Sequence, residues 1–231
     1  MIPSGLEILA HEETPLGLLC LRRRGIPGRP GATVTEITLD HEFLMSSYVT
    51  ASEEALARLA IGMHGGRGLS VLIGGLGLGY TARAALASDR VAHVDVVELL
   101  PQVIGWLRGG LVPLSAELTA DPRFHAVQGD VYARLSGPPQ RTYDLVLVDV
   151  DHSPAEHLGG ANASFYGDDG LALAKRHLAP GGVLGVWSYA QDTPFAHALR
   201  RVFREVHEEG ITVVNDLVDT EQTDWLFFAR G

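Results

Sequence analysis

The sequence has little cysteine, few basic residues and no long apolar run. Its 231 residues include one cysteine, Cys20, so no disulfide can form within the chain. Low cysteine content fits a reducing compartment, and we therefore expect a cytoplasmic protein. No run of roughly 18 apolar residues occurs, and the first residues lack the pattern of a signal peptide. We therefore expect no contact with a membrane.

Acidic residues outnumber basic ones. The chain has 28 Asp and Glu against 18 Lys and Arg, which gives a net charge of −10. Such a chain repels phosphate backbones at long range, so we expect no nucleic-acid partner. A negative charge is compatible with a cationic small molecule. With 46% hydrophobic residues and no internal repeat, the composition is that of an ordinary globular protein.

A turn-rich spacer divides the first part of the chain from the rest. The spacer covers residues 25–31 and reads GIPGRPG. Patterns typical of β-strands flank it at residues 16–21 and 34–39. We therefore predict a small N-terminal β-rich appendage over residues 1–50 and a larger α/β domain over residues 51–231.

Predicted strands and helices alternate in the larger domain. The strands fall at 69–73, 93–98, 124–128, 143–149 and 183–187, and the helices at 52–63, 80–86, 101–107, 170–178 and 194–203. This alternation predicts a mostly parallel sheet with helices on both faces. Two final strands, near 211–214 and 225–229, have no helical pattern between them, which favours an antiparallel pair. The expected fold is α/β and Rossmann-like, with seven strands and a ligand at their carboxyl ends.

The most informative segment is the glycine-rich turn after the first of these strands. It carries Gly74, Gly75, Gly77 and Gly79 between a strand and a helix. Glycine adopts tight-turn backbone angles at low cost and lets a ligand approach the main chain. Glu98 ends the next strand, where a carboxylate can accept hydrogen bonds from ribose hydroxyls. These five residues predict a site for a nucleoside-containing cofactor.

The turn alone does not select the cofactor. The residues from Gly77 to Ala82 also match the fingerprint G-x-G-x-x-A of NAD-binding proteins. Two later features favour another group: Asp130 follows the third strand, where an acid can bind the adenine amino group, and Pro180-Gly181-Gly182 precedes the fifth strand. With them, the sequence resembles the S-adenosylmethionine-dependent methyltransferase fold family, and within it the spermidine synthase branch.

The resemblance covers about residues 69–190. It rests on the following segments, in this order: Ile73-Gly74-Gly75, Val97-Glu98-Leu99, Asp121-Pro122-Arg123, Gly129-Asp130, Tyr143 to Asp149, Phe165-Tyr166 and Pro180-Gly181-Gly182. It implies that the glycine-rich turn holds the methionine part of the cofactor, Glu98 the ribose and Asp130 the adenine. It also implies that Asp149, beside the cofactor, is the catalytic acid that orients an attacking amine and helps to accept its proton, with Asp151 assisting.

Further residues complete the expected site. His152 is a candidate base, and Tyr166 and Trp187 are candidates for the wall of the acceptor pocket. The acceptor is expected to be a small molecule. The histidines show no metal-ligand spacing, so we expect no metal. The family often dimerises through its N-terminal part, which implies a homodimer.

One difference from the family's sequence pattern bears on whether the chain transfers a methyl or an aminopropyl group. Gly77 stands where aminopropyltransferases carry the aspartate that holds the amino group of decarboxylated S-adenosylmethionine. This favours a methyltransferase that uses S-adenosylmethionine and acts on a small acceptor, such as an amine. One alternative is a polyamine aminopropyltransferase, a spermidine synthase that uses the decarboxylated cofactor. The other is a non-catalytic nucleotide-binding protein that kept the fold.

Overall fold

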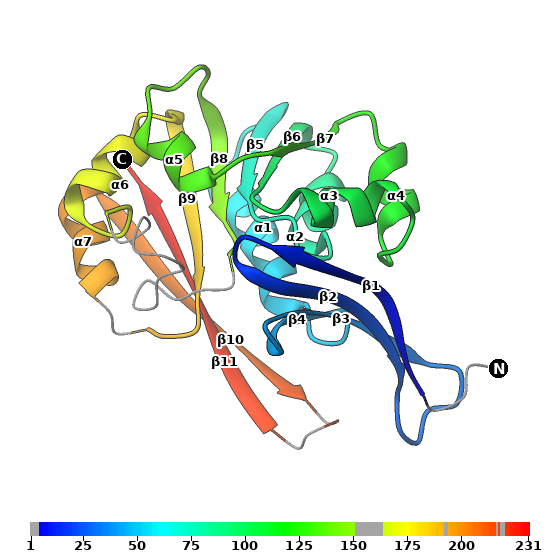
Figure 1. Cartoon of the computed structure of the whole chain (residues 1–231). Helices are drawn as coiled ribbons and strands as arrows, with labels where there is room; N and C mark the ends of the chain where they lie inside the picture. Colours follow the sequence, from blue (N-terminus) through cyan, green and yellow to red (C-terminus); the bar gives the residue numbers. More distant parts are fainter. Residues whose placement is uncertain (1–4, 151–163, 192–193, 216, 218–219) are drawn as a thin grey trace.

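Two β-sheets organise the computed structural model, which describes residues 5–150, 164–191, 194–215, 217 and 220–231. The N-terminal sheet is antiparallel, with its four strands in sequence order. Its strands are β1 (Leu6–Thr14), β2 (Gly17–Gly25), β3 (Thr33–Leu39) and β4 (Glu42–Ser46). Figure 1 shows this sheet in blue beside the helices of the larger unit. The sequence predicted β2 and β3, whereas β1 and β4 are findings of the structure.

The second sheet has seven strands in the order β10-β11-β9-β8-β5-β6-β7. Its strands are β5 (Leu69–Gly74), β6 (Val91–Glu98), β7 (Phe124–Gln128), β8 (Tyr143–Val148), β9 (Leu178–Ser188), β10 (Glu205–Asn215) and β11 (Thr220–Arg230). Neighbouring strands in the series β9, β8, β5, β6 and β7 are parallel to each other. Strand β11 is antiparallel to both of its neighbours, β10 and β9. The predicted mostly parallel sheet with an antiparallel edge is therefore confirmed.

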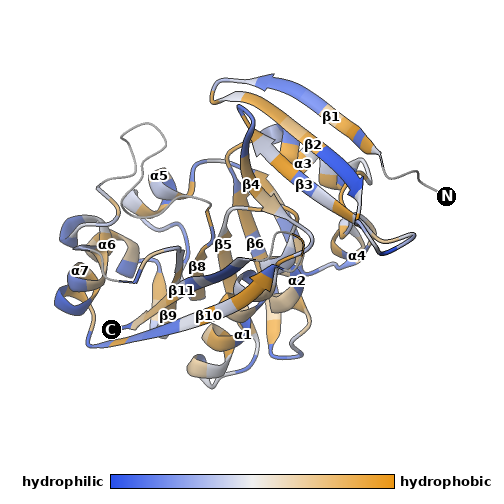
Figure 2. Cartoon of the chain, turned by 90° about the horizontal axis from the view of Figure 1, so that it is seen from below, coloured by the Kyte–Doolittle hydropathy of each residue, from blue (hydrophilic) through white to orange (hydrophobic). Residues whose placement is uncertain are grey.

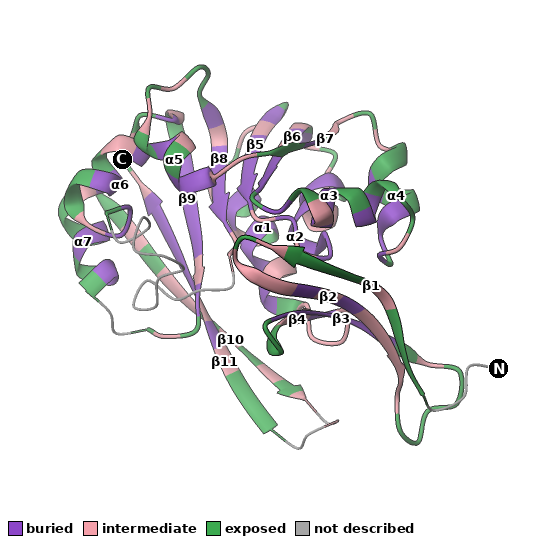
Figure 3. Ribbon diagram, in the orientation of Figure 1, coloured by how far each residue is buried: buried purple, intermediate pink, exposed green. Residues whose placement is uncertain are grey.

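Helices cover both faces of this sheet. They are α1 (Ala51–His64), α2 (Tyr80–Leu86), α3 (Pro101–Arg108), α4 (Ser115–Ala120), α5 (Val131–Ser136), α6 (Asp168–Lys175) and α7 (Pro194–Val202). Along β5, Val71 and Ile73 pack with α1, α2 and α3, whereas Leu72 packs with α5, α6 and α7. Strand side chains alternate between faces, so a strand covered on both sides reads as a continuous apolar run. Figures 2 and 3 show the hydrophobic, buried centre of the sheet.

The N-terminal sheet packs onto the larger unit. Leu19, Leu21, Ile37 and Leu39 belong to the same buried hydrophobic cluster as α1 and β5. A hydrogen bond 2.7 Å long from Trp106 Nε1 in α3 to Glu12 Oε1 in β1 adds a polar tie. Because one cluster runs through both parts, the predicted division at residue 50 stays a prediction. None of the helices in the described ranges is long and apolar enough to span a membrane.

Two of the differences between the predicted and the observed helix boundaries have a clear tertiary cause. The helix expected over 170–178 ends at Lys175, because Leu178 pairs with Tyr143 and so begins β9. The helix expected from Ser52 begins one residue earlier, and the buried Ser52 hydroxyl bonds to Asp224 rather than capping the helix. In both cases a partner far away in the sequence overrides the local signal.

Candidate functional site

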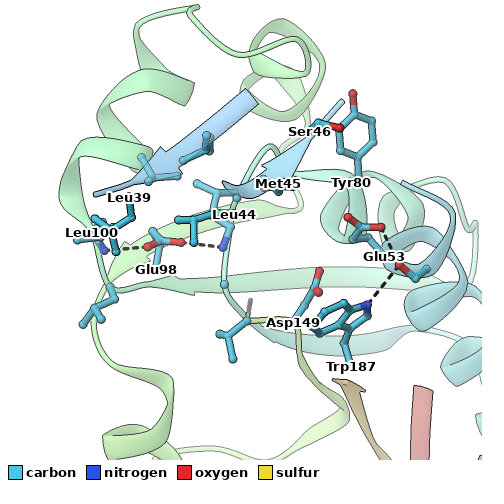
Figure 4. Close-up of a pocket in the computed structure, with 18 of the residues that line it drawn as sticks. Leu39, Leu44, Met45, Ser46, Glu53, Tyr80, Glu98, Leu100, Asp149 and Trp187 are labelled. Carbon is cyan, nitrogen blue, oxygen red and sulfur yellow. Dashed lines mark hydrogen bonds between the residues drawn. The ribbon is translucent and has the colours of Figure 1, made fainter. Parts of the chain in front are cut away.

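A cavity of about 510 Å³ lies where the parallel strands of the large sheet end. Ligands bind at this edge in open α/β sheets, as the sequence predicted. Its walls come from β4, the start of α1, the glycine-rich turn, the ends of β6 and β8, and the β10–β11 hairpin. Figure 4 shows Glu98 among leucines on one side, and Asp149, Glu53 and Trp187 on the other. The cavity thus has an apolar side and a carboxylate-rich side.

Two of the four predicted glycines face the cavity. Gly75 has φ +93°, and a Cβ there would lie 2.0 Å from the backbone oxygen of Asp149. Gly77 has φ +48°, and a Cβ there would lie 2.2 Å from Met45 Sδ. Gly74 ends β5 and Gly79 precedes α2, and neither is among the residues lining the cavity. The main structural reason for glycine at positions 75 and 77 is therefore close packing against Asp149 and Met45.

Glu98 joins two loops at the end of β6. Its side chain lines the cavity, although the residue is only 8% exposed. Glu98 Oε2 accepts a hydrogen bond from Leu76 N, and Oε1 accepts one from Leu100 N, each 2.8 Å long. Burial raises the pKa of the Glu98 carboxyl, and backbone N–H groups oppose that rise. The sequence did not indicate this bridging role, and the predicted contact with a ribose stays a prediction.

Asp130 caps α5. Its Oδ1 accepts hydrogen bonds from Tyr132 N at 2.8 Å and from Ala133 N at 3.3 Å. An aspartate in this position supplies partners for the first N–H groups of a helix. Both bonds use Oδ1, and Asp130 is among the residues that line the cavity. The predicted adenine contact is compatible with this position and stays a prediction.

Asp149 follows β8 directly and lines the cavity beside the glycine-rich turn. Its backbone N donates a hydrogen bond 2.8 Å long to Gly74 O, and Thr81 Oγ1 donates one to Oδ2. Burial raises the pKa of Asp149 to about 6, the Thr81 hydrogen bond lowers it, and the charge of Asp224 raises it. A carboxylate with such a pKa can act as a base near neutral pH.

Two further carboxylates reach the same side of the cavity. Glu53 comes from the first turn of α1 and Asp224 from β11. Burial and the charge of Asp149 together raise the pKa of Glu53 to about 8. Sequence reasoning missed both residues. Glu53 resembled an acid placed to start a helix, and Asp224 lies among other polar residues of a strand.

The remaining predicted residues have different positions. Trp187 lines the cavity, and its Nε1 donates a hydrogen bond 3.2 Å long to Ser52 Oγ. Tyr166 lies in the hydrophobic cluster under α5 and α6, with its hydroxyl 2.6 Å from that of Tyr132, a lining residue. Tyr166 itself is not among the described lining residues. Asp151 and His152 lie outside the described residues, so their predicted roles stay predictions.

Comparisons with known proteins place the fold. No family model matches the chain. A spermidine synthase in complex with the transition state analogue AdoDATO aligns with a TM-score of 0.74 and 18% identity, over 96% of this chain and 73% of that one. The spermidine synthase from Thermotoga maritima aligns with a TM-score of 0.75 and 17% identity, over 97% and 73%.

Similar sequences carry a related name. The polyamine aminopropyltransferase 2 of Streptomyces coelicolor is 35% identical over 135 residues, which are 58% of this chain and 23% of that protein. The polyamine aminopropyltransferase of Mycobacterium tuberculosis is 35% identical over 131 residues, or 54% and 24%. The matches thus span about a quarter of these longer relatives. The resemblance predicted from the sequence is confirmed, and the chain has the spermidine synthase fold.

Proposed function

We propose that this chain is an aminopropyltransferase that uses decarboxylated S-adenosylmethionine as donor and a small amine as acceptor. The observation that carries the proposal is the acidic lining of the cavity, which has no basic side chain beside it among the described residues. Five acidic side chains line it: Glu53, Glu98, Asp130, Asp149 and Asp224. No Lys, Arg or His is found among its described lining residues. Such a cavity favours ligands that carry only positive charge.

The cavity's charge distinguishes the two donors. Intact S-adenosylmethionine carries a carboxylate, whereas its decarboxylated form has an ammonium and a sulfonium and no negative group. A carboxylate placed among buried acids, with no cation beside it, is strongly disfavoured. This supports the aminopropyl reaction over the methyl transfer that we inferred from Gly77. The names of the similar proteins favour the same alternative.

The donor fits the residues present. The backbone of Gly75 and Gly77 forms one wall of the cavity, beside Glu98. Asp130 also lines the cavity, with one carboxylate oxygen outside its capping bonds. When bound, the donor supplies a carbon activated by sulfonium, whose bond to sulfur breaks, with the electron pair leaving on sulfur, as the acceptor nitrogen bonds to that carbon.

Asp149 then prepares the acceptor. An ammonium group has no lone pair, so an amine must lose a proton before it can attack. Asp149, with a pKa raised by burial to about 6, is ionised at neutral pH and can take that proton. The Thr81 hydroxyl holds one oxygen of Asp149 and so fixes where the other points. Thr81 is therefore a positioning residue.

The first experiment is a calorimetric titration with S-adenosylmethionine, its decarboxylated form and NAD. We expect the decarboxylated form to bind at least about ten-fold more tightly than the intact one, which corresponds to 1.4 kcal/mol. Adding 1,4-diaminobutane should then yield methylthioadenosine. Tighter binding of intact S-adenosylmethionine would favour the methyltransferase hypothesis. Binding of NAD alone would contradict both the aminopropyltransferase and the methyltransferase hypotheses.

A pair of variants tests whether the cavity charge is the cause. Asp224→Asn removes one negative charge and keeps the shape of the side chain. It should therefore reduce, several-fold, the ratio of the affinity for the decarboxylated donor to the affinity for intact S-adenosylmethionine. The matched control is Glu221→Gln, because Glu221 lies on the same strand, is exposed and does not line the cavity. An equal change of preference in both variants would contradict the charge argument.

A further inference from the structure

The buried hydroxyl of Ser52 lies between two carboxylates. Ser52 Oγ is 2.7 Å from Asp224 Oδ2 and 3.1 Å from Glu53 Oε2. Trp187 Nε1 donates a hydrogen bond to the same oxygen over 3.2 Å. Ser52 is 2% exposed, so water cannot readily supply other partners. Three side chains therefore compete for one hydroxyl group.

The Ser52 hydroxyl can donate a hydrogen bond to only one of the two carboxylates. A serine hydroxyl has one hydrogen to donate and two lone pairs that accept. The shorter distance assigns the hydrogen to Asp224, and Trp187 occupies one lone pair. If that hydrogen goes to Asp224, none is left for Glu53 Oε2, which lies 3.1 Å from Ser52 Oγ and then meets its second lone pair. Oxygen lone pairs at this distance repel each other unless one oxygen carries a hydrogen, so the contact is favourable when Glu53 is protonated and donates.

The surroundings of Glu53 favour the protonated form as well. The titratable groups that act on Glu53 are Asp149 at the end of β8 and Asp224 in β11, and its own charge acts on Tyr80 in α2. No basic side chain is present among the described residues that line the cavity. Burial and Asp149 raise the pKa of Glu53 to about 8. Figure 4 shows its carboxyl in the region of Asp149 and Trp187.

We infer that Glu53 is a specificity-determining residue that is a neutral acid before the acceptor binds and ionises to contact the acceptor's ammonium. The inference rests on the proposed function, because it assumes that the acceptor is a cationic amine. The proton of Glu53 passes to solvent, and the carboxylate that remains pairs with the incoming positive charge. A neutral acceptor offers no charge to offset the ionisation of a buried acid. The pair of Glu53 and Asp224 thus selects acceptors by charge.

The first test needs no acceptor. Infrared spectra of the whole protein at pH 7 are compared with those of Glu53→Gln and Glu54→Gln. The carbonyl band of protonated carboxyl groups should be present in the natural protein, clearly weaker in Glu53→Gln and unchanged in Glu54→Gln. Glu54 is a matched control, because it is the next residue of α1 and pairs with Arg83 outside the cavity. Identical spectra for the natural protein and Glu53→Gln would overturn the inference.

The second test measures protons released on binding. Calorimetric titrations with 1,4-diaminobutane at pH 7, in buffers of different ionisation enthalpy, give the number of protons set free. We expect the natural protein and Glu54→Gln to release about one proton more than Glu53→Gln. Glu53→Gln should also raise the KM for the diamine about ten-fold, with a smaller change in kcat. Equal proton release by all three proteins would overturn the coupling to Glu53.

The two proposals can fail separately. If the diamine binds and reacts while Glu53 shows no carboxyl band, the aminopropyltransferase proposal stands and the inference about Glu53 is wrong. If the band is present and no diamine binds, the acceptor class is wrong, and so is the coupling built on it. If the band is present and the diamine removes it, both are supported.

Discussion

Met45 Sδ accepts a hydrogen bond from the backbone N–H of Leu78, with 3.0 Å between sulfur and nitrogen. This contact joins the N-terminal sheet to the glycine-rich turn. The same sulfur occupies the volume in which a side chain at position 77 would begin. The glycine at position 77 and the methionine at position 45 are therefore two parts of one structural arrangement.

This arrangement predicts a measurable coupling between the two positions. Gly77→Ala should lower the free energy of unfolding by roughly 1–3 kcal/mol, because a Cβ there would meet Met45 Sδ at 2.2 Å. Met45→Ala should remove the clash, although the strain of φ +48° stays. Denaturant unfolding of both single variants and the double variant should give a coupling energy of about 1 kcal/mol. Strictly additive losses would contradict the contact.

Replacing Asp149 should separate binding from turnover. In Asp149→Asn the amide can still accept the Thr81 hydrogen bond, so donor affinity should fall by no more than the several-fold loss expected for removing one cavity charge. Loss of the base should lower kcat by roughly 10²–10⁴-fold. The control is Asp144→Asn, because Asp144 lies near the opposite end of β8 and accepts hydrogen bonds from Ser70. A similar loss of turnover in both variants would mean that Asp149 has no special role.

Removing the Thr81 hydroxyl should change the pH dependence of the reaction. The Thr81 hydrogen bond lowers the pKa of Asp149, so Thr81→Val should raise that pKa above its value of about 6. A base works only when deprotonated, and the acidic limb of kcat/KM should therefore move to higher pH. Thr119→Val is a suitable control, since its hydroxyl bonds to Ser115 O within α4. An unmoved limb would count against Thr81 as a positioning residue.

The ionisation of Glu53 should also appear in the stability of the protein. Its pKa is raised from 4.5 to about 8, so folding favours the protonated form. The contribution of Glu53 to the free energy of unfolding is fully present below pH 4.5 and is lost as pH rises towards 8. The reason is that Glu53 ionises at lower pH in the unfolded chain than in the folded protein. The free energy of unfolding of Glu53→Gln should lack this loss, so the variant should gain on the order of 5 kcal/mol relative to the natural protein across that range. A constant difference at every pH would be the contrary result.

Replacing Glu98 should reduce both the affinity for the donor and the stability of the fold. Glu98→Ala should weaken binding of decarboxylated S-adenosylmethionine by about 1–3 kcal/mol, as expected when hydrogen bonds to a charged group are lost. It should also destabilise the fold, because Leu76 N and Leu100 N lose their partner. Calorimetry and denaturant unfolding measure the two effects. Unchanged affinity in a destabilised variant would leave Glu98 as a structural residue only.

The sequence predicted the large sheet because its signals are local. Residues 69–73 and 143–149 are short apolar runs, which is the pattern of strands covered on both faces. The strand β1 gave no such signal, because most of its residues are exposed. The short α4 and α5 were also missed, since six residues give too little helical periodicity.

The candidate site was predictable only where residues follow strand ends. Glu98 ends β6, Asp149 directly follows β8 and Asp130 comes two residues after β7, and all three line the cavity. Glu53 and Asp224 join them through tertiary contacts: Ser52 and Asp224 bond across 172 positions of the sequence. Local pattern cannot reveal such contacts, which bring Glu53 and Asp224 to the carboxylate-rich side of the cavity.

The β10–β11 hairpin carries its contribution to the cavity at alternate positions. Val213 and Asn215 on β10, and Gln222 and Asp224 on β11, line the cavity, while the residues between them face the other way. An insertion or deletion of one residue would therefore exchange the whole set of side chains presented there. Substitutions at the alternate positions, in contrast, change that set without altering the pairing. The hairpin therefore allows the cavity lining to change at these four positions while the strand pairing of the sheet is kept.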